Sequence, residues 1–282
     1  KQMATGTSYG AGEYFVLAND LDFASVTFHG VKNFSGNFYG LGFALKNISI
    51  TGAWQYWNGS SYANMPSNSY GYGVFCNTSG VVITDLIVQD YEYLDMPRTS
   101  IFARGRGSCV GGIVGYSTGQ CNILNCHTIG YIGSPNLTYG MHTPWGGIIG
   151  EHNTTASLIV YRCTSTVDMH GKYSGDFVPL YGGIIGESLG ASTTLSILEC
   201  AGRITAELPT AYYTEIGCIC GQLENMGLLR IENVVGEGEI ISGLRAVSGS
   251  LGYIDRVSSV KLSNVYVGTT IGASTATKLP EY

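Results

Sequence analysis

The sequence predicts an all-β solenoid, specifically a parallel β-helix. Three observations predict it: a glycine motif returns at a nearly constant interval, short runs alternate apolar with polar residues, and no segment shows a sustained helical period. We expect a single domain over residues 1–282 with about six to seven rungs. Residues 1–53 would form an N-terminal capping rung, 54–268 the repeats, and 269–282 a C-terminal tail or cap.

The glycine motif defines the repeat. It reads Gly-Gly-Ile-Val-Gly or Gly-Gly-Ile-Ile-Gly, has two degenerate later copies, and ends at glycines 115, 150, 186, 221 and 252. The intervals between these glycines are 35, 36, 35 and 31 residues. Glycine at one place in every rung suits a corner with positive φ or a close approach of two backbones, so we interpret the motif as structural.

A second element ends eleven to fourteen residues after the last glycine of each motif. It is a short run of alternating apolar and polar residues, the pattern of a strand. Its copies begin at Ile83, Ile123, Val160, Ile197, Ile231 and Leu262. Such short strands cannot bury a face alone, but stacking them ~4.8 Å apart buries a continuous core.

Three cysteines keep step with the repeat. Cys126, Cys163 and Cys200 are 37 residues apart, and we expect them to form an inward ladder of small apolar side chains. Cys218 and Cys220 form a Cys-x-Cys pair, but no second pair with the spacing of metal ligands follows. The sequence leaves open whether Cys109 and Cys121 form a disulfide.

The repeats resemble a known family. The Gly-Gly-Ile-Ile-Gly elements, each followed by an apolar run ending in Cys or Val, are similar to the GLUG-type repeats of bacterial surface proteins, and the run from Tyr14 to Ile50 resembles the opening rung that often precedes them. This resemblance covers about residues 12–268. It implies a right-handed β-helix of pectin-lyase-like shape in an adhesin-like, exported protein.

Composition excludes several functions. Charged residues make up 12% of the chain and its net charge is −6, which argues against a nucleic-acid surface. No stretch offers the ~18 apolar residues of a membrane span, so we expect no membrane insertion. Glycines flank apolar strands without a following Lys or helix, so no phosphate loop is present. We expect no cofactor and no metal, and a location outside the cell or on its surface.

Catalytic candidates are few. The residues directly after the glycine motif are Tyr116, Glu151, Glu187, Gln222 and Tyr253. If the rungs stack in register, Glu151 and Glu187 lie about 5 Å apart with His152 beside them, the separation of the carboxylates in a retaining glycosidase. The alternative is that the two glutamates follow a turn on a solvated edge. The acidic cluster typical of pectin-lyase-like enzymes is not evident.

Long inserts between the strands carry most aromatic residues. We place them at about 53–72, 89–108, 131–145, 170–181 and 205–216, all on one side of the rod. Tyrosine and tryptophan offer rigid contact area with a polar tip, which suits glycans or protein partners, and arginine suits an acidic sugar. The candidate binding residues are Trp54, Tyr56, Trp57, Tyr91, Tyr93, Tyr131, Tyr139, Trp145, Tyr173, Arg104 and Arg106.

Three functions remain open at this stage. The first is a non-catalytic, adhesin-like surface module that binds a glycan or a host or microbial surface protein through the aromatic inserts. The second is a polysaccharide hydrolase or lyase that uses Glu151 and Glu187. The third is a passive stalk. The fold alone does not choose among them, since β-helices host all three functions. We prefer the first, because recognition requires only a surface, whereas catalysis requires a constellation of residues that this sequence does not show.

Overall fold

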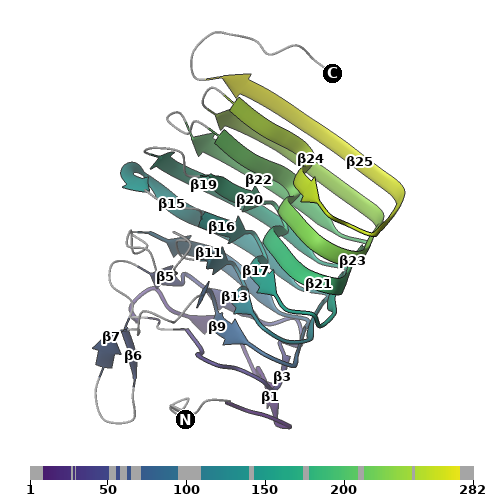
Figure 1. Ribbon diagram of the computed structural model, residues 1–282. Coiled ribbons are helices and arrows are strands. Elements are labelled where there is room, and N and C mark those ends of the chain that lie inside the picture. The colour runs from purple at the N-terminus through teal and green to yellow at the C-terminus, as the bar shows by residue number, and fades with distance from the viewer. Residues whose placement is uncertain are drawn as a thin grey trace.

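The computed structural model is a parallel β-solenoid (Figure 1), as the sequence predicts. It describes residues 9–26, 28, 30–50, 55–57, 62–64, 71–94, 109–139, 143–173, 178–208, 213–242 and 245–273. Within these ranges there is no helix, and all strands but β6 (Gln55–Trp57) and β7 (Tyr62–Asn64) belong to one sheet. β6 and β7 pair with each other in antiparallel fashion.

Each turn of the solenoid has four sides, which we number in chain order. Side 1 contains β8 (Gly71–Tyr72), β12 (Cys109–Gly111), β16 (Thr143–Gly146) and β20 (Pro179–Gly182). Side 2 contains β9 (Phe75–Thr78), β13 (Val114–Ser117), β17 (Ile149–Asn153) and the start of β21 (Ile185–Leu198). The later turns run through these sides as parts of β23 (Tyr213–Ser242) and β24 (Arg245–Asp255).

Sides 3 and 4 complete the turn. Side 3 contains β1 (Tyr14–Val16), β3 (Asn37–Tyr39), β10 (Val81–Thr84), β14 (Cys121–Leu124) and β18 (Leu158–Tyr161). Side 4 contains β2 (Leu21–Asp22), β4 (Ala44–Lys46), β5 (Ser49–Ile50), β11 (Ile87–Tyr93), β15 (His127–Tyr139), β19 (Thr164–Tyr173) and β22 (Ala201–Leu208). β23 and β25 (Ser259–Ala273) extend both sides toward the C-terminal end.

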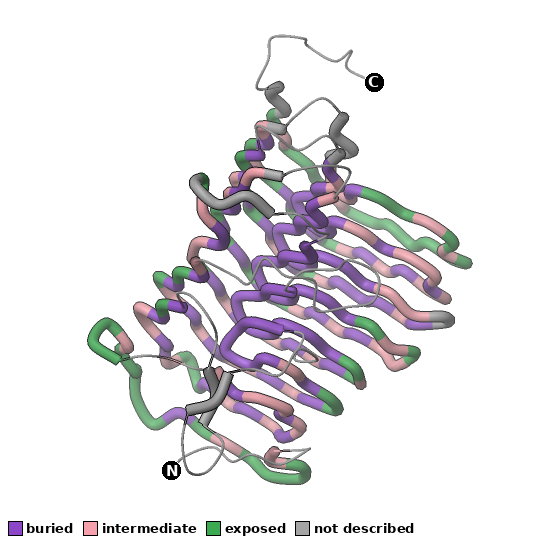
Figure 2. Tube along the Cα trace, turned by 60° about the vertical axis from the view of Figure 1, so that its left-hand side comes forward, coloured by how far each residue is buried: buried purple, intermediate pink, exposed green. Residues whose placement is uncertain are grey.

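The predicted register of side 3 is confirmed. One inward column passes through Phe15, Phe38, Ile83, Ile123, Val160, Ile197, Ile231 and Leu262, each paired with the next. Apolar residues therefore stack on like residues, and the buried residues run the length of the rod between the sides (Figure 2).

The glycine motif joins sides 1 and 2, and its role is close approach. None of the glycines in its three intact copies has a positive φ. A Cβ on Gly150 would lie 2.5 Å from the backbone N of Val110 and 2.6 Å from the carbonyl O of Gly115. A Cβ on Gly186 would lie 2.5 Å from the backbone N of Trp145. The strands of the two sides thus touch backbone to backbone, which only glycine permits.

The corner between sides 3 and 4 uses a left-handed residue in each turn. The column consists of Asp85, Asn125, Arg162, Glu199, Asn233 and Asn264, with φ between 50° and 55°. Neighbours in the column also bond through their side chains: Asn125 donates to Asp85 (2.6 Å), Arg162 to Glu199 (2.7 Å) and Asn264 to Asn233 (2.9 Å). Asn and Asp adopt this conformation more readily than other non-glycine residues.

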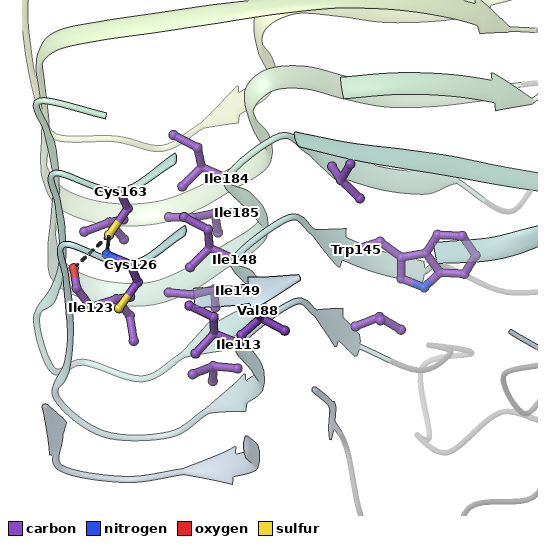
Figure 3. Close-up of a cluster of buried hydrophobic side chains, with 14 of the residues drawn as sticks. Val88, Ile113, Ile123, Cys126, Trp145, Ile148, Ile149, Cys163, Ile184 and Ile185 are labelled. Carbon is purple, nitrogen blue, oxygen red and sulfur yellow. Dashed lines mark hydrogen bonds between the residues drawn. The ribbon is translucent and has the colours of Figure 1, made fainter. Parts of the chain in front are cut away.

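The predicted cysteine ladder follows this corner (Figure 3). Cys126, Cys163 and Cys200 are all buried, and the backbone N–H groups of Cys126 and Cys163 each donate to the sulfur one turn above, at 3.4 Å. All eight cysteines are free thiols, Cys109 and Cys121 included. Burial raises the pKa of the Cys163 thiol well above its usual range.

We therefore expect the native protein to be inert to thiol reagents. An aromatic disulfide reagent should release no chromophore from the folded chain over minutes, and eight equivalents after denaturation without reductant, because thiolates are the reactive species and every sulfur is buried. Fewer than eight equivalents after denaturation would reveal a disulfide and contradict the structure.

The predicted inserts are shorter than the sequence indicated. β15 continues to Tyr139 and β16 begins at Thr143, so most of 131–145 is strand. The same holds for parts of 170–181 and 205–216, because β19, β20, β22 and β23 extend into them. The predicted tail is also partly strand, since 269–273 complete β25 in register with β23.

Counting only the residues that the structure describes, the last turn is covered on one side. Val260 and Leu262 continue inward columns that are fully buried at Leu229 and Ile231, yet they are 46% and 55% exposed. Among the described residues, no strand pairs with the outer edge of β25.

Candidate functional site

The two predicted carboxylates stack as the sequence indicated. Glu151 of β17 pairs in register with Glu187 of β21, and the same column contains Tyr116 below them and Gln222 above. Their Cα atoms are therefore about one strand spacing, ~4.8 Å, apart.

Both carboxylates lie inside the molecule. Glu151 is 1% exposed and Glu187 is fully buried. The Cys109 thiol of side 1 lies 2.8 Å from Oε2 of Glu151, and the Asn153 amide donates to Oε1 at 3.0 Å. Glu151 is thus held between sides 1 and 2 by hydrogen bonds, as a buried polar group must be.

His152 points away from this pair, into the core. It belongs to a column with Ser117 and Ser188, and all three residues are fully buried. Its Nε2 contacts the carbonyl O of Ala156 at 3.1 Å, whereas its Nδ1 has no hydrogen-bond partner within the described part of the chain. Burial lowers the pKa of His152 to about 4, so the ring is neutral at physiological pH. It is not beside the two carboxylates as predicted, because adjacent residues on a strand face opposite sides.

Three of the predicted binding aromatics are core residues, which corrects the prediction. Tyr91, Tyr93 and Trp145 are fully buried. The Tyr93 hydroxyl donates to the carbonyl of Gly112 at 3.3 Å, and Trp145 stacks on Tyr181 with ring centroids 4.7 Å apart. They belong to the same hydrophobic core as the inward columns, so they offer no surface to a ligand.

Glycines of side 4 make room for Tyr91 and Trp145 inside the molecule. A Cβ on Gly130 would overlap the ring of Tyr91, and a Cβ on Gly133 would lie 2.6 Å from Trp145. Glycine on one strand makes room for a ring from another.

Of the other candidates, Trp54, Arg104 and Arg106 lie outside the described residues, as do the side chains of Tyr56, Trp57, Tyr139 and Tyr173.

Tyr131 is the predicted aromatic that the structure places on an outer face. It is half-buried on the outward side of β15, and its ring stacks on His170 of β19 at 5.1 Å with an interplanar angle of 13°. His170 Nδ1 in turn lies 3.3 Å from a carboxylate oxygen of Glu207. Two rings and a carboxylate thus form one cluster across three strands, which we call the Tyr131 cluster.

Carboxylates surround the Tyr131 cluster. Tyr131 is in register with Glu92 on one side and Asp168 on the other. Partial burial raises the pKa of Tyr131, and the charges of Asp168, Glu207 and Glu92 raise it further. A partly exposed aromatic ring with hydrogen-bond acceptors around it can contact an apolar ring face, and the acceptors can accept hydrogen bonds from hydroxyl groups.

Tyr131 was predicted from the sequence, whereas His170, Asp168 and Glu207 were not. A signal was present: Asp168 follows Tyr131 by 37 residues and Glu207 follows His170 by 37, the interval of the cysteine ladder. Applying that interval to outward positions would have assembled the cluster.

Another acidic group stands out at the N-terminal part of β23. Partial burial raises the pKa of Glu215 to about 7, and the charge of Glu224 adds to this shift. Its Oε2 is buried and has no hydrogen-bond partner in the ranges that the structure describes. Across the described ranges, no three His, Cys, Asp or Glu side chains are arranged to hold a metal ion. The described chain also has no helix with the length and apolar character needed to cross a bilayer.

Comparison with known proteins gives no further guide to function. No family model, curated protein or solved structure matches this chain.

Proposed function

We propose that this chain is a non-catalytic, adhesin-like surface module of the GLUG-repeat type, exported by a bacterium, that binds a glycan through the outer face of side 4. The observation that carries the proposal is the Tyr131 cluster, in which an accessible tyrosine is held rigid by stacking on His170. A protein partner at the same face is the second outcome of the test below.

The parallel pairing of side 4 supports a binding role. Its strands pair from β11 to β25, with irregularities only between Gln89 and Tyr91 and between Gly133 and Thr138 among the described residues, so its outward side chains line up along the rod. Presenting ring and carboxylate on rigid strands costs little conformational entropy on binding.

The hydrolase alternative has less support. A glycosidase needs its two carboxylates at the scissile bond, and Glu151 and Glu187 are buried between sides 1 and 2. A passive stalk would leave the Tyr131 cluster without a ligand.

The test is a glycan-panel binding assay on the folded chain with Tyr131→Ala. We expect the variant to weaken glycan binding roughly tenfold, since losing an aromatic anchor costs about 1–2 kcal/mol. Tyr266→Ala is the matched control, because Tyr266 is an exposed tyrosine on the same face several turns away, and it should bind as the parent does.

Release of sugar from the panel, abolished in Glu151→Gln or Glu187→Gln, would overturn the non-catalytic assignment. Binding to surface proteins but to no glycan would mean that the ligand is a protein. Absence of any binding would leave the passive stalk as the remaining function.

A further inference from the structure

A pocket lies at the corner between sides 3 and 4, near the N-terminal end of the rod. It has a volume of about 430 Å³ and is open to solvent, and its lining residues are Leu41, Gly42, Asp85, Ile87, Asn125 and His127. Its volume falls within the range of small-molecule sites, ~300–1,000 Å³.

A two-residue insertion creates this pocket. Tyr39 pairs with Thr84, and Ala44 pairs with Ile87. Four residues, 40–43, therefore span the lower corner where only two, 85–86, span the corner above it. The extra length turns outward at Leu41 and Gly42, whose φ angles are 54° and 79°. Leu41 is 58% exposed there and forms a wall that the later corners lack.

The polar groups of the pocket are held in place. Oδ1 of Asp85 accepts a 2.6 Å hydrogen bond from Asn125, and Oδ2 accepts one of 2.9 Å from Thr84. The Nδ1 atom of His127 lies 2.8 Å from the hydroxyl of Thr164, and its Nε2 has no partner among the described residues. Asp85 retains lone pairs for further donors, and Nε2 of His127 can bond a ligand hydroxyl.

This chemistry fits one class of ligand. The pocket is lined by a carboxylate (Asp85), an amide (Asn125) and an imidazole (His127), next to the apolar side chains of Leu41 and Ile87. The polar groups can form hydrogen bonds with hydroxyl groups of a ligand, while the apolar side chains cover the apolar face of its ring. The carboxylate of Asp85 disfavours an anionic ligand. We propose that the pocket binds one ring of a neutral saccharide.

The proposal rests on the glycan-binding function above and extends it to a second position. His127, Ile129 and Tyr131 are alternate residues of β15 and point outward. The pocket and the Tyr131 cluster therefore share one face, about 13 Å apart for four residues of strand. Exposed Ile129 lies between them. An oligosaccharide with one ring in the pocket can thus extend along β15 to Tyr131.

The experiment measures binding of neutral methyl glycosides and of their oligosaccharides to four proteins by calorimetry and by ligand-observed NMR: the parent chain, Asp85→Asn, His127→Ala and Tyr131→Ala. Asn tolerates the left-handed backbone of position 85, so Asp85→Asn removes the charge with little strain. Glu199→Gln, at the equivalent place in a later corner, is the control, and thermal unfolding checks that each variant folds.

We expect both pocket variants to weaken monosaccharide binding roughly tenfold, with Tyr131→Ala weakening only the oligosaccharides. Oligosaccharide binding that needs Tyr131 but is unchanged in Asp85→Asn and His127→Ala would overturn the proposal that the pocket binds a sugar, and it would leave the proposed function standing. A preference for anionic sugars would also overturn the proposal for the pocket. No saccharide binding by the parent chain would overturn both.

Discussion

Replacing Gly150 by alanine should prevent folding or lower the free energy of unfolding by about 3 kcal/mol or more. The added methyl group would lie 2.5 Å from the backbone N of Val110, 2.6 Å from the carbonyl O of Gly115 and 2.8 Å from the carbonyl C of Val110. These neighbours are backbone atoms of β12 and β13, and each of these strands pairs with one strand in the turn above and one in the turn below. They therefore cannot rotate away as a side chain would. Relief requires that sides 1 and 2 separate, which would open the space between them.

Gly268→Ala is the matched control. It makes the same chemical change, but the nearest atom to the new Cβ would be Cε1 of Tyr266 at 3.5 Å, an ordinary contact. We expect its stability to stay within about 0.5 kcal/mol of the parent chain. Urea unfolding followed by far-UV circular dichroism measures both. If Gly150→Ala unfolds at the parent's urea concentration, the two sides do not meet through their backbones.

Acidification should cost the protein about 3 kcal/mol through His152 alone. The pKa of His152 is about 4 in the folded chain, against ~6.5 for an unperturbed histidine. Because burial disfavours the charged ring, the unfolded chain takes up the proton first. His152 thus contributes its full stability above pH 6.5 and loses it as the pH falls from 6.5 to 4.

His152→Leu isolates this effect. Leucine already occupies the same inward column at Leu223, two turns above, so the column accepts it. We expect the unfolding free energy of the parent chain to fall relative to the variant by about 3 kcal/mol between pH 7.5 and 4. Parallel pH profiles would mean that His152 can be protonated without unfolding.

The titration of Glu215 changes the free energy of unfolding in the opposite direction to that of His152 as the pH falls. The comparison with a variant is needed for this reason. Its pKa in the folded chain is about 7, above the ordinary value for a glutamate, so its ionisation opposes folding at high pH. That cost disappears as the pH falls from 7 toward 4.5. The pH profile of the parent chain alone therefore mixes two trends, and Glu215 cancels from the difference between parent and His152→Leu.

The sequence predicted the features that depend on register. A repeat near 36 residues with strand-like alternation is enough to stack Glu151 on Glu187 and Cys126 on Cys163, because parallel strands in adjacent turns pair equivalent positions. The direction of each side chain was harder to predict. The sequence does not show that β15 runs on to Tyr139 or that Tyr91, Tyr93 and Trp145 belong to the core.

The aromatic residues show this difference. Tyr91 and Tyr131 both looked like insert residues, yet Tyr91 is an inward residue that packs where Gly130 leaves space, whereas Tyr131 faces out. A bulge at Asp90, with φ of 55°, shifts the alternation of β11 by one residue and turns Tyr91 and Tyr93 inward. The corner pocket was also unforeseen, because it depends on a length difference between two consecutive corners.

The exposed inner face of the last turn has a consequence for how the rod opens. Each turn is stabilised by its neighbours, and the turn containing Val260 and Leu262 has a neighbour on one side only among the described residues. In a linear array of this kind, the free energy of local opening is lowest at a turn with one neighbour and rises toward the interior. Within the described residues, amide protons of β25 are therefore expected to exchange with solvent sooner than those of β14 or β18, which have a paired strand on both sides.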